Sequence, residues 1–461
     1  MKKNIAGAVF LLLFFAMMLS ASVTMPFIKQ DGTAEKRILA KFPSIRTEDG
    51  SLSLTAFPAQ FEDWLDDHVG LRMVWMQQYA RLHAALGASV NDQVIVGDDG
   101  WLYFEPTLPD YTGVDALTEN ERWRARCALE TLDRALDVPL VVFFAPNKNT
   151  VSPDAMPDSY PRADGPHAMH WLIENADVNI IDTVAPLTGE GLYHATDTHW
   201  NNKGARIGAG LIIGAVNKAA GAQGTAPDPD GEYALEPYTG DLGQMLFPHN
   251  PPADVQLAYA DAAQNFDFAG RYRTPEDLTI TTEGSGAKLN VLMLRDSFTN
   301  LLIEPISNAY SNVQYRRAMP FPLTDAEEYD AVVLEMVERR IGELLSGTPQ
   351  IPAPEAEPFS GEANCAAQAF FTEEKDRTLI FGAMDSAPDC LTKVTVSITA
   401  SGRTSYYEAF PTAGREDFTG DGCFSLYVDK LPKGAVLQVC MTGAETRISE
   451  KTEILPAESI P

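Results

Sequence analysis

Residues 289–298 read Leu289-Asn290-Val291-Leu292-Met293-Leu294-Arg295-Asp296-Ser297-Phe298, an apolar run that ends in a short polar turn. The run is short and does not alternate polar with apolar positions, which predicts a strand buried on both faces of a mainly parallel sheet. Residues 298–302 can begin a helix. Ser297 is therefore predicted to lie at the carboxyl end of a strand, where functional side chains gather in open α/β sheets.

The same pattern recurs through the middle of the chain. Short apolar runs predict further strands at 140–144, 178–181 and 331–337. Helices are predicted near 118–136, 166–175 and 202–219. Strands that alternate with helices indicate an α/β layer fold. Before this region, residues 94–104 predict a β-hairpin, because two apolar runs flank an Asp-Gly turn.

The length of 461 residues allows two or three domains. We predict an export segment at 1–28, an entry region at 29–115, an α/β domain at 116–345 with an insertion at 221–285, a Pro-rich linker at 346–358 and a small β-sandwich at 359–461. The entry region contains a helical run to about residue 85, whose apolar positions recur at helical spacing and predict that it docks on another element. Alternation at period two after residue 393 indicates the β-sandwich.

The N-terminus has the composition of an export signal. Lys2 and Lys3 precede an uncharged run from Asn4 to Ile28. The small residues at 20–22 offer a cleavage site, whereas the uncharged run is long enough to cross a bilayer as a retained anchor. In both cases the chain after about residue 29 is predicted to be extracytoplasmic, because the lysines stay inside.

The net charge narrows the range of partners. The chain carries 64 acidic residues against 35 Lys plus Arg, a formal charge of −29. Such a charge repels phosphate backbones and anionic lipid heads, so nucleic acid is not an expected partner. A neutral or mildly charged glycan is a better expected substrate than a strongly anionic polymer.

Four of the five cysteines lie in the last hundred residues, at Cys365, Cys390, Cys423 and Cys440. In an exported chain this clustering predicts up to two disulfides, whose connectivity the sequence leaves open. Cys127 is predicted to be a buried thiol.

Ser297 is a candidate nucleophile. A serine at a strand-to-helix turn can expose its hydroxyl while backbone N–H groups at the helix start stabilise an oxyanion. The alternative is structural, because Ser297 or Asp296 can serve only as the N-cap of the helix.

Asp197 and His199 are candidates for the orienting acid and the general base. Residues two apart in an extended segment point the same way, so the Asp197 carboxylate can bind one imidazole nitrogen and leave the other free. Alternatively, Asp197 satisfies backbone groups and His199 packs beside Trp200. A third reading joins His194, Asp197 and His199 as ligands of a metal-dependent hydrolase. Acyl transfer by a Ser-His-Asp site requires no metal or cofactor, and we predict none.

These motifs resemble a known family. The segment Asp197-Thr198-His199-Trp200-Asn201, followed by Lys203-Gly204-Ala205, and the later segment 292–298 resemble the alginate O-acetyltransferase family of SGNH-like proteins and the related "DHHW" exported proteins. Segments 37–43, 94–104 and 333–339 look like the same family, and the resemblance covers about residues 30–345.

The resemblance implies an SGNH-hydrolase-like parallel sheet flanked by helices. It implies Ser297 as nucleophile, His199 as base and Asp197 as its partner, in acyl transfer to or from polysaccharide hydroxyls. It also implies a membrane-bound O-acyltransferase as a possible acyl donor. Some family members carry a C-terminal carbohydrate-binding β-domain, which is a possible role for residues 359–461.

The sequence offers further candidates around this site. Asn147 is a candidate oxyanion donor and Lys148 can meet a substrate anion. Arg295 replaces the Gly of the family's usual Gly-Asp-Ser block, where it can crowd the turn or bind substrate. Tyr238 in the insertion can line a substrate groove, with a simple turn as the alternative.

Two expectations concern a buried acid and a second function. Glu335 lies in an apolar strand and needs a partner, for which an ion pair with Arg316, Arg317 or Arg339 is expected. Arg295 and the extra tail domain also fit an alternative function, a catalytically degenerate polysaccharide-binding or scaffold protein of a surface-assembly complex.

Overall fold

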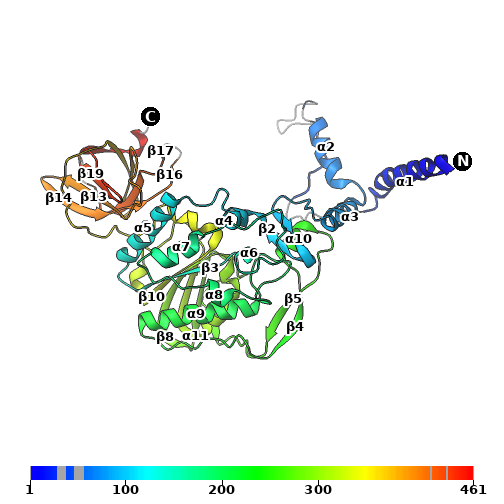
Figure 1. Ribbon diagram of the computed structural model, residues 1–461, viewed down its shortest axis with the longest axis horizontal. Helices are drawn as coiled ribbons and strands as arrows, with labels where there is room; N and C mark the ends of the chain where they lie inside the picture. Colours follow the sequence, from blue (N-terminus) through cyan, green and yellow to red (C-terminus); the bar gives the residue numbers. More distant parts are fainter. Residues whose placement is uncertain are drawn as a thin grey trace.

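The computed structural model of the protein describes residues 2–28, 38–45, 55, 57–165, 167–415, 418–431 and 434–459. An α/β domain occupies the centre, with a sheet-rich C-terminal domain on one side and three N-terminal helices on the other (Figure 1). The N-terminal helices are α1 (Lys2–Thr24), α2 (Phe57–His68) and α3 (Arg72–Ala85). The predicted α/β fold with a β-rich tail is confirmed.

The central sheet has the strand order β3-β10-β8-β9-β7-β6. Four neighbouring strands run parallel: β3 (Leu140–Ala145), β10 (Ala331–Val337), β8 (Ala287–Leu294) and β9 (Tyr310–Arg316). Two antiparallel strands complete one edge: β7 (Thr279–Gly284) and β6 (Phe266–Phe268). The run quoted first, residues 289–294, is thus part of a strand in the middle of the sheet.

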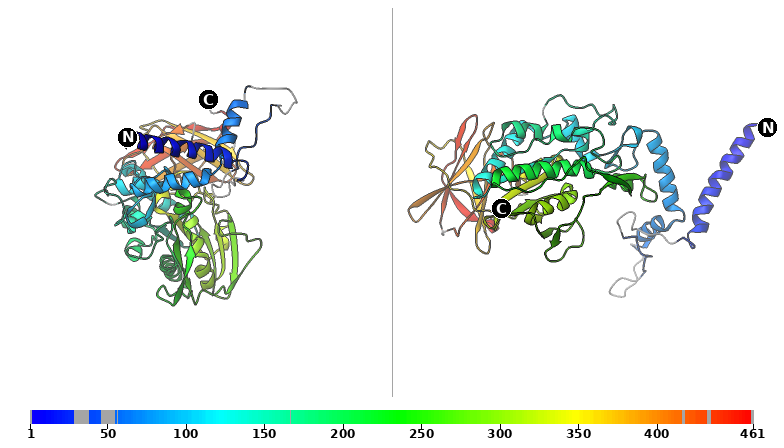
Figure 2. Two further views of the ribbon diagram at one scale, coloured as in Figure 1. Left: turned by 90° about the vertical axis from the view of Figure 1, so that its right-hand side faces the viewer. Right: turned by 90° about the horizontal axis from the view of Figure 1, so that it is seen from below.

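Both faces of this sheet are buried, as the uninterrupted apolar runs predict. Along β3, Val141 and Phe143 pack on one face, whereas Val142 and Phe144 pack on the other. The first face is covered by α9 (Asn202–Ala220) and α11 (Ile303–Ala309). The second is covered by α5 (Glu119–Ala135) and α7 (Ala168–Asn175), and Figure 2 shows the sheet between its helical layers.

Three predicted elements differ from the structure. Residues 178–181 lie beside β3 but form only one bridge, Ile180 with Val142, instead of a strand. The helix expected after Ser297 begins as the 3₁₀ turn η4 (Ser297–Leu301), which the Asp296 side chain caps. The helical run to residue 85 is two helices, since Leu71 has a left-handed backbone (φ 59°) that a right-handed helix cannot continue through.

Two hairpins lie on the same side of the molecule. The predicted hairpin is confirmed as β1 (Val94–Val96) and β2 (Leu102–Phe104). The region 221–285 contains a second hairpin, β4 (Tyr233–Tyr238) and β5 (Asp254–Tyr259), with α10 (Asp241–Leu246) between its strands. Leu242 and Leu246 of α10 pack on Val94 and Leu102, so the two hairpins are joined by a small apolar core.

Nine strands of the C-terminal domain form one connected set around a common core, and β16 (Gly414–Arg415) and β17 (Phe418–Thr419) form a separate pair. Its longer strands are β11 (Ala367–Glu373), β12 (Thr378–Met384), β13 (Lys393–Ala400), β14 (Arg403–Glu408), β18 (Cys423–Val428), β19 (Val436–Thr442) and β21 (Thr452–Pro456). Cys127 of α5 is fully buried, as predicted, and it joins this core. The two domains therefore pack directly on one another.

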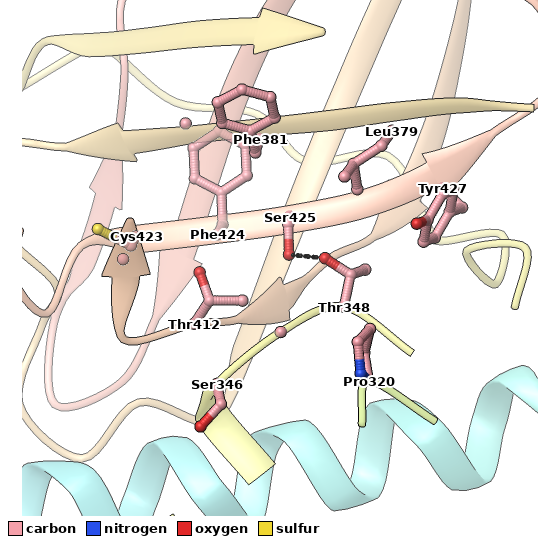
Figure 3. Close-up of a pocket in the computed structure, with 13 residues that line it drawn as sticks. Pro320, Ser346, Thr348, Leu379, Phe381, Thr412, Cys423, Phe424, Ser425 and Tyr427 are labelled. Atoms are coloured by element: carbon pink, nitrogen blue, oxygen red, sulfur yellow. Dashed lines mark hydrogen bonds between the residues drawn. The ribbon is translucent and has the colours of Figure 1, made fainter. Parts of the chain in front are cut away.

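The Pro-rich segment 346–358 is packed against the C-terminal domain and does not hold the domains apart. Pro352 pairs with Tyr427, and Ile351 and Ala353 are buried. Figure 3 shows the Thr348 hydroxyl bound to the Ser425 hydroxyl beside a cavity of about 210 Å³ between this segment and the sheet.

The predicted disulfides are not formed, and all five cysteines carry thiols. Cys423 lies on β18 and Cys440 on β19, two strands that are not neighbours, whereas Cys365 and Cys390 lie outside the strands.

The N-terminal segment is helical from Lys2 to Thr24. Searched over its described residues, the protein has no helix with the length and apolarity that a bilayer crossing demands. Export, with a cleaved signal or a retained anchor, stays a prediction.

Candidate active site

Ser297 lies in a rigid turn where β8 ends. The two carboxylate oxygens of Asp296 accept hydrogen bonds from the backbone N–H groups of Phe298 (2.9 Å) and of Val337 at the end of β10 (2.8 Å). Asp296 is thus the predicted N-cap, and it leaves the partly exposed Ser297 hydroxyl available. Backbone N–H groups at the helix start were the expected oxyanion donors, but the first one after Ser297, that of Phe298, is already bound to Asp296.

His199 joins Ser297 to Asp197. Its Nε2 lies 2.9 Å from the Ser297 hydroxyl, and its Nδ1 lies 2.7 Å from one Asp197 oxygen. The same Asp197 oxygen accepts the backbone N–H of His199, which holds the short segment in shape. Asn201 then caps α9 with its side chain, so the segment runs straight into a helix buried on the sheet. The structure brings together the three residues that the sequence pattern selected.

The second oxygen of Asp197 is held by the β4–α10 region. It accepts hydrogen bonds from the Tyr238 hydroxyl and from the backbone N–H of Asp241, each at 2.8 Å. Tyr238 was expected to line a substrate groove, and its hydroxyl instead orients the acid. The β4–α10 region therefore completes the site from outside the sheet.

These contacts set the protonation states. Burial acts to raise the pKa of Asp197, but the hydrogen bonds and the charge of His199 outweigh it and hold that pKa well below its usual range. Burial acts to lower the pKa of His199, yet the hydrogen bond to Asp197 outweighs it and the pKa is raised. The pair favours an ionised Asp197 beside an imidazole that readily takes up a proton.

Lys148 has a structural position and does not face a substrate. The residue is 3% exposed, and its ammonium donates to the carbonyl oxygens of Leu102 (2.6 Å), Ala195 (2.8 Å) and Asp197 (3.2 Å). Burial lowers its pKa to about 7, while the nearby carboxylates act in the opposite direction. The predicted role in binding a substrate anion is not supported, because the ammonium ties β2 to the Asp197 segment.

Asn147 and Arg295 are also bound to other groups. The Asn147 side chain is fully buried and donates to Asp110 at 3.1 Å, so its amide does not serve as an exposed oxyanion donor. The Arg295 guanidinium is buried and donates to the carbonyl oxygens of Pro275 and Asp277. It supports the turn and neither crowds it nor lies open to a substrate.

The prediction that Glu335 forms an ion pair is wrong. Among the described residues its carboxylate forms none. It accepts hydrogen bonds from the Asp296 N–H (2.9 Å) and the Thr299 hydroxyl (2.7 Å). Burial and the neighbouring Asp296 charge raise its pKa well above the ordinary value. Glu335 therefore stabilises the turn that carries Ser297 by accepting these two hydrogen bonds.

Arg339 is a site residue that the sequence reasoning named only as a partner for Glu335. Its guanidinium lies 5.7 Å from the ring centre of Phe298, the residue after Ser297, and 5.2 Å from that of Phe104. Its Nη1 is buried, and in the described chain it has no hydrogen-bond partner. Arg339 ends segment 333–339, and the resemblance of this segment to the family was the signal in the sequence that could have identified it.

The three residues of the alternative metal site, His194, Asp197 and His199, do not form a ligand cluster. His194 stacks on the Tyr238 ring at 4.1 Å between ring centres and lies 3.8 Å from Asp254. Within the residues that the structure describes, the group of possible ligands consists of Asp197, His199 and Asp241, whose ligand atoms lie within 4.8 Å of one another. Asp241 thus takes the place that the sequence reading gave to His194.

Comparison with known proteins agrees with the resemblance in the motifs. Residues 94–271 match the family described as SGNH hydrolase-like domain, acetyltransferase AlgX. Over 199 residues the chain is 27% identical to the probable alginate O-acetylase AlgJ of Pseudomonas syringae pv. tomato, covering 40% of this chain and 49% of that protein. The AlgJ of Azotobacter vinelandii, also called probable, is 25% identical over 236 residues, covering 45% and 57%.

Among solved structures, the O-acetyltransferase domain of Pseudomonas putida AlgJ is 19% identical, with a TM-score of 0.34 and coverage of 54% of this chain and 92% of that one. The chain spans about half the length of the curated relatives it matches. The predicted resemblance to SGNH-like alginate O-acetyltransferases is confirmed. The matched family region contains Asp197, His199 and Tyr238 but ends before Ser297.

Gly240 tests the contact between the insertion and Asp197. A Cβ at this position would lie 2.1 Å from the Thr196 carbonyl oxygen, so Gly240→Ala must push Tyr238 and Asp241 away from Asp197. We expect kcat for an activated acetyl ester to fall about 10²-fold, the usual effect of a displacement of about 1 Å in a site.

Gly214→Ala is the matched control, because a Cβ there meets nothing within 4 Å and alanine favours the helix. Tyr238→Phe, which removes only the hydroxyl, should reproduce part of the loss without steric strain. Full activity in both Gly240→Ala and Tyr238→Phe would show that the insertion does not orient the site.

Proposed function

We propose that this protein is an extracytoplasmic O-acyltransferase or esterase that acts on hydroxyl groups of a cell-surface or exported polysaccharide. The observation that carries the proposal is the Ser297–His199 contact of 2.9 Å, with Asp197 on the other imidazole nitrogen. The names of the similar proteins, AlgX and AlgJ, support acetyl as the acyl group.

The chemistry follows from these contacts. The Ser297 oxygen attacks the acyl carbonyl carbon of the donor while His199 Nε2 takes the hydroxyl proton. His199 returns this proton to the leaving donor oxygen, and the acyl group remains on Ser297. A glycan hydroxyl then gives its proton to His199, attacks the acyl carbon and releases Ser297, which recovers the proton. Water in place of the glycan makes the same cycle an esterase.

Arg339 is proposed to stabilise the oxyanion. The tetrahedral intermediate carries a full negative charge, and donors aimed at it in a water-poor site lower the barrier. The partly exposed Arg339 side chain lies beside Phe298, and its guanidinium is suited to this role because the Phe298 N–H is occupied by Asp296.

Two further proposals concern partners. A membrane-bound O-acyltransferase is a suitable donor for an enzyme outside the cytoplasm, and a neutral or mildly charged glycan suits a chain of −29 charge.

The competing scaffold function drew on Arg295, whose guanidinium is bound to Pro275 and Asp277. This binding removes the steric argument for a degenerate site.

Ser297 is expected to carry the acyl group. Incubation with an activated acetyl ester should add one acetyl mass to the Ser297 peptide, and Ser297→Ala should lose both the adduct and the turnover. Ser311→Ala, which removes another partly buried hydroxyl, should keep both. Undiminished turnover in Ser297→Ala would exclude the proposed nucleophile.

The rate of acylation is expected to rise with pH through the pKa of His199. The imidazole must be neutral to accept the proton, and its pKa is raised above the ordinary value of about 6.5. Asp197→Asn removes the negative charge and weakens the hydrogen bond that raise it, so the midpoint should move to lower pH.

An NMR titration of the His199 ring in a Ser297→Ala background should follow the same shift. It separates His199 from Lys148, whose pKa of about 7 lies in the same range. An unchanged His199 midpoint in Asp197→Asn would contradict the assigned partnership.

Removing Arg339 is expected to affect the chemical step. Arg339→Met should lower kcat roughly 10²–10³-fold with little change in KM, as loss of an oxyanion donor does. Arg339→Lys should recover part of kcat, because it restores a cation. Arg317→Met removes an arginine that is paired with Glu276 and should keep kcat. A rise in KM alone would instead assign Arg339 to substrate binding.

A further inference from the structure

Helix α3 is fastened to the catalytic domain by one of its faces. The Gln77 side chain donates to the Asn250 carbonyl oxygen (3.0 Å) and accepts its N–H (3.2 Å), and Gln77 and Ala80 are buried. Asn250 lies between α10 and β5, in the same region that supplies Tyr238 and Asp241 to the active site. The position of α3 is therefore coupled to that of the site.

The opposite face of α3 is apolar and exposed. The exposed fractions are 40% for Trp75, 56% for Tyr79, 62% for Leu82 and 76% for Leu86, the residue that follows the helix. Their i, i+4, i+7, i+11 spacing forms one stripe, and at 100° per residue this stripe lies opposite Gln77 and Ala80. Single exposed apolar residues are ordinary, whereas a continuous stripe marks a contact surface.

The charge of α3 runs against that of the whole chain. Between residues 72 and 85 there are Arg72, Arg81 and His83 and no acidic residue, in a protein of formal charge −29. Tryptophan and tyrosine favour the boundary between lipid and water, and basic side chains favour anionic headgroups. A second copy of this chain is a poorer occupant, because in a symmetric pair α3 would face an identical basic helix.

The surroundings of α3 point to the same occupant. The apolar helix α1 exposes large side chains, among them Phe10, Leu12 and Leu13. α1, α2 and α3 gather at the end of the α/β domain that lies opposite the C-terminal domain (Figures 1 and 2). The apolar faces of α1 and α3 thus belong to one end of the molecule.

We propose that the outer face of α3, formed by Trp75, Tyr79, Leu82 and Leu86, lies in the headgroup layer of a membrane that contains anionic lipid. The helix is parallel to the bilayer surface in this arrangement, and the Gln77–Asn250 contact holds the active-site region beside the membrane. The proposal concerns binding and is independent of the acyl-transfer chemistry.

The test uses the full chain with vesicles of phosphatidylcholine and phosphatidylglycerol whose acyl chains carry bromine near the headgroup. Bromine quenches tryptophan at short range, α1 contains no tryptophan, and Trp75 is the tryptophan of α3. We expect quenching of the wild type to be lost in Trp75→Phe and kept in Trp64→Phe, the matched change in α2. Membrane attachment through α1 does not affect this comparison.

A second variant tests the stripe itself. Leu82→Gln with Leu86→Gln should weaken quenching of Trp75, whereas Leu278→Gln, at a site 70% exposed elsewhere, should not. Quenching that is equal in Trp75→Phe and wild type would overturn the proposal. A dimer of the detergent-solubilised chain that the double leucine variant abolishes would overturn it in favour of a second copy.

Discussion

The Asp197 carboxylate is the constraint on which the active site depends. It is almost fully buried, and a buried charge is costly unless donors surround it. Here four hydrogen bonds do so, two from His199 and one each from Tyr238 and Asp241. Because these donors come from two separate parts of the chain, stabilising one charge also locks the β4–α10 region onto the catalytic domain.

The nucleophile turn is built on the same principle. Asp296 binds the N–H of Phe298 and that of Val337, while Glu335 binds the Asp296 N–H from the next strand. Two neighbouring parallel strands therefore hold one turn, and Ser297 is presented without any flexible connection. Lys148 acts likewise on the other side of the site, since its three carbonyl contacts join the β1–β2 hairpin to the Asp197 segment.

The net charge of the whole chain is a poor guide to the charges within a single site. The chain carries −29 overall, yet cations lie on both sides of the proposed catalytic residues, Lys148 behind Asp197 and Arg339 beside Phe298. The same contrast holds at α3, which has no acidic residue. Electrostatic effects within a site depend on distances of a few ångströms, whereas net charge governs solubility and long-range attraction.

The sequence by itself determined the α/β fold, the central strand through Leu294 and the roles open to Ser297, His199 and Asp197, because hydrophobic period and short spacing are local properties. It did not determine the donors on Asp197, the burial of Asn147 and Lys148, or the position of Arg339. Those depend on which distant segments share a surface, and Tyr238 reaches Asp197 only after the β4–α10 region packs against the Asp197 segment. Only the tertiary structure decides such contacts, since a side chain's partners follow from packing and not from its neighbours in the chain.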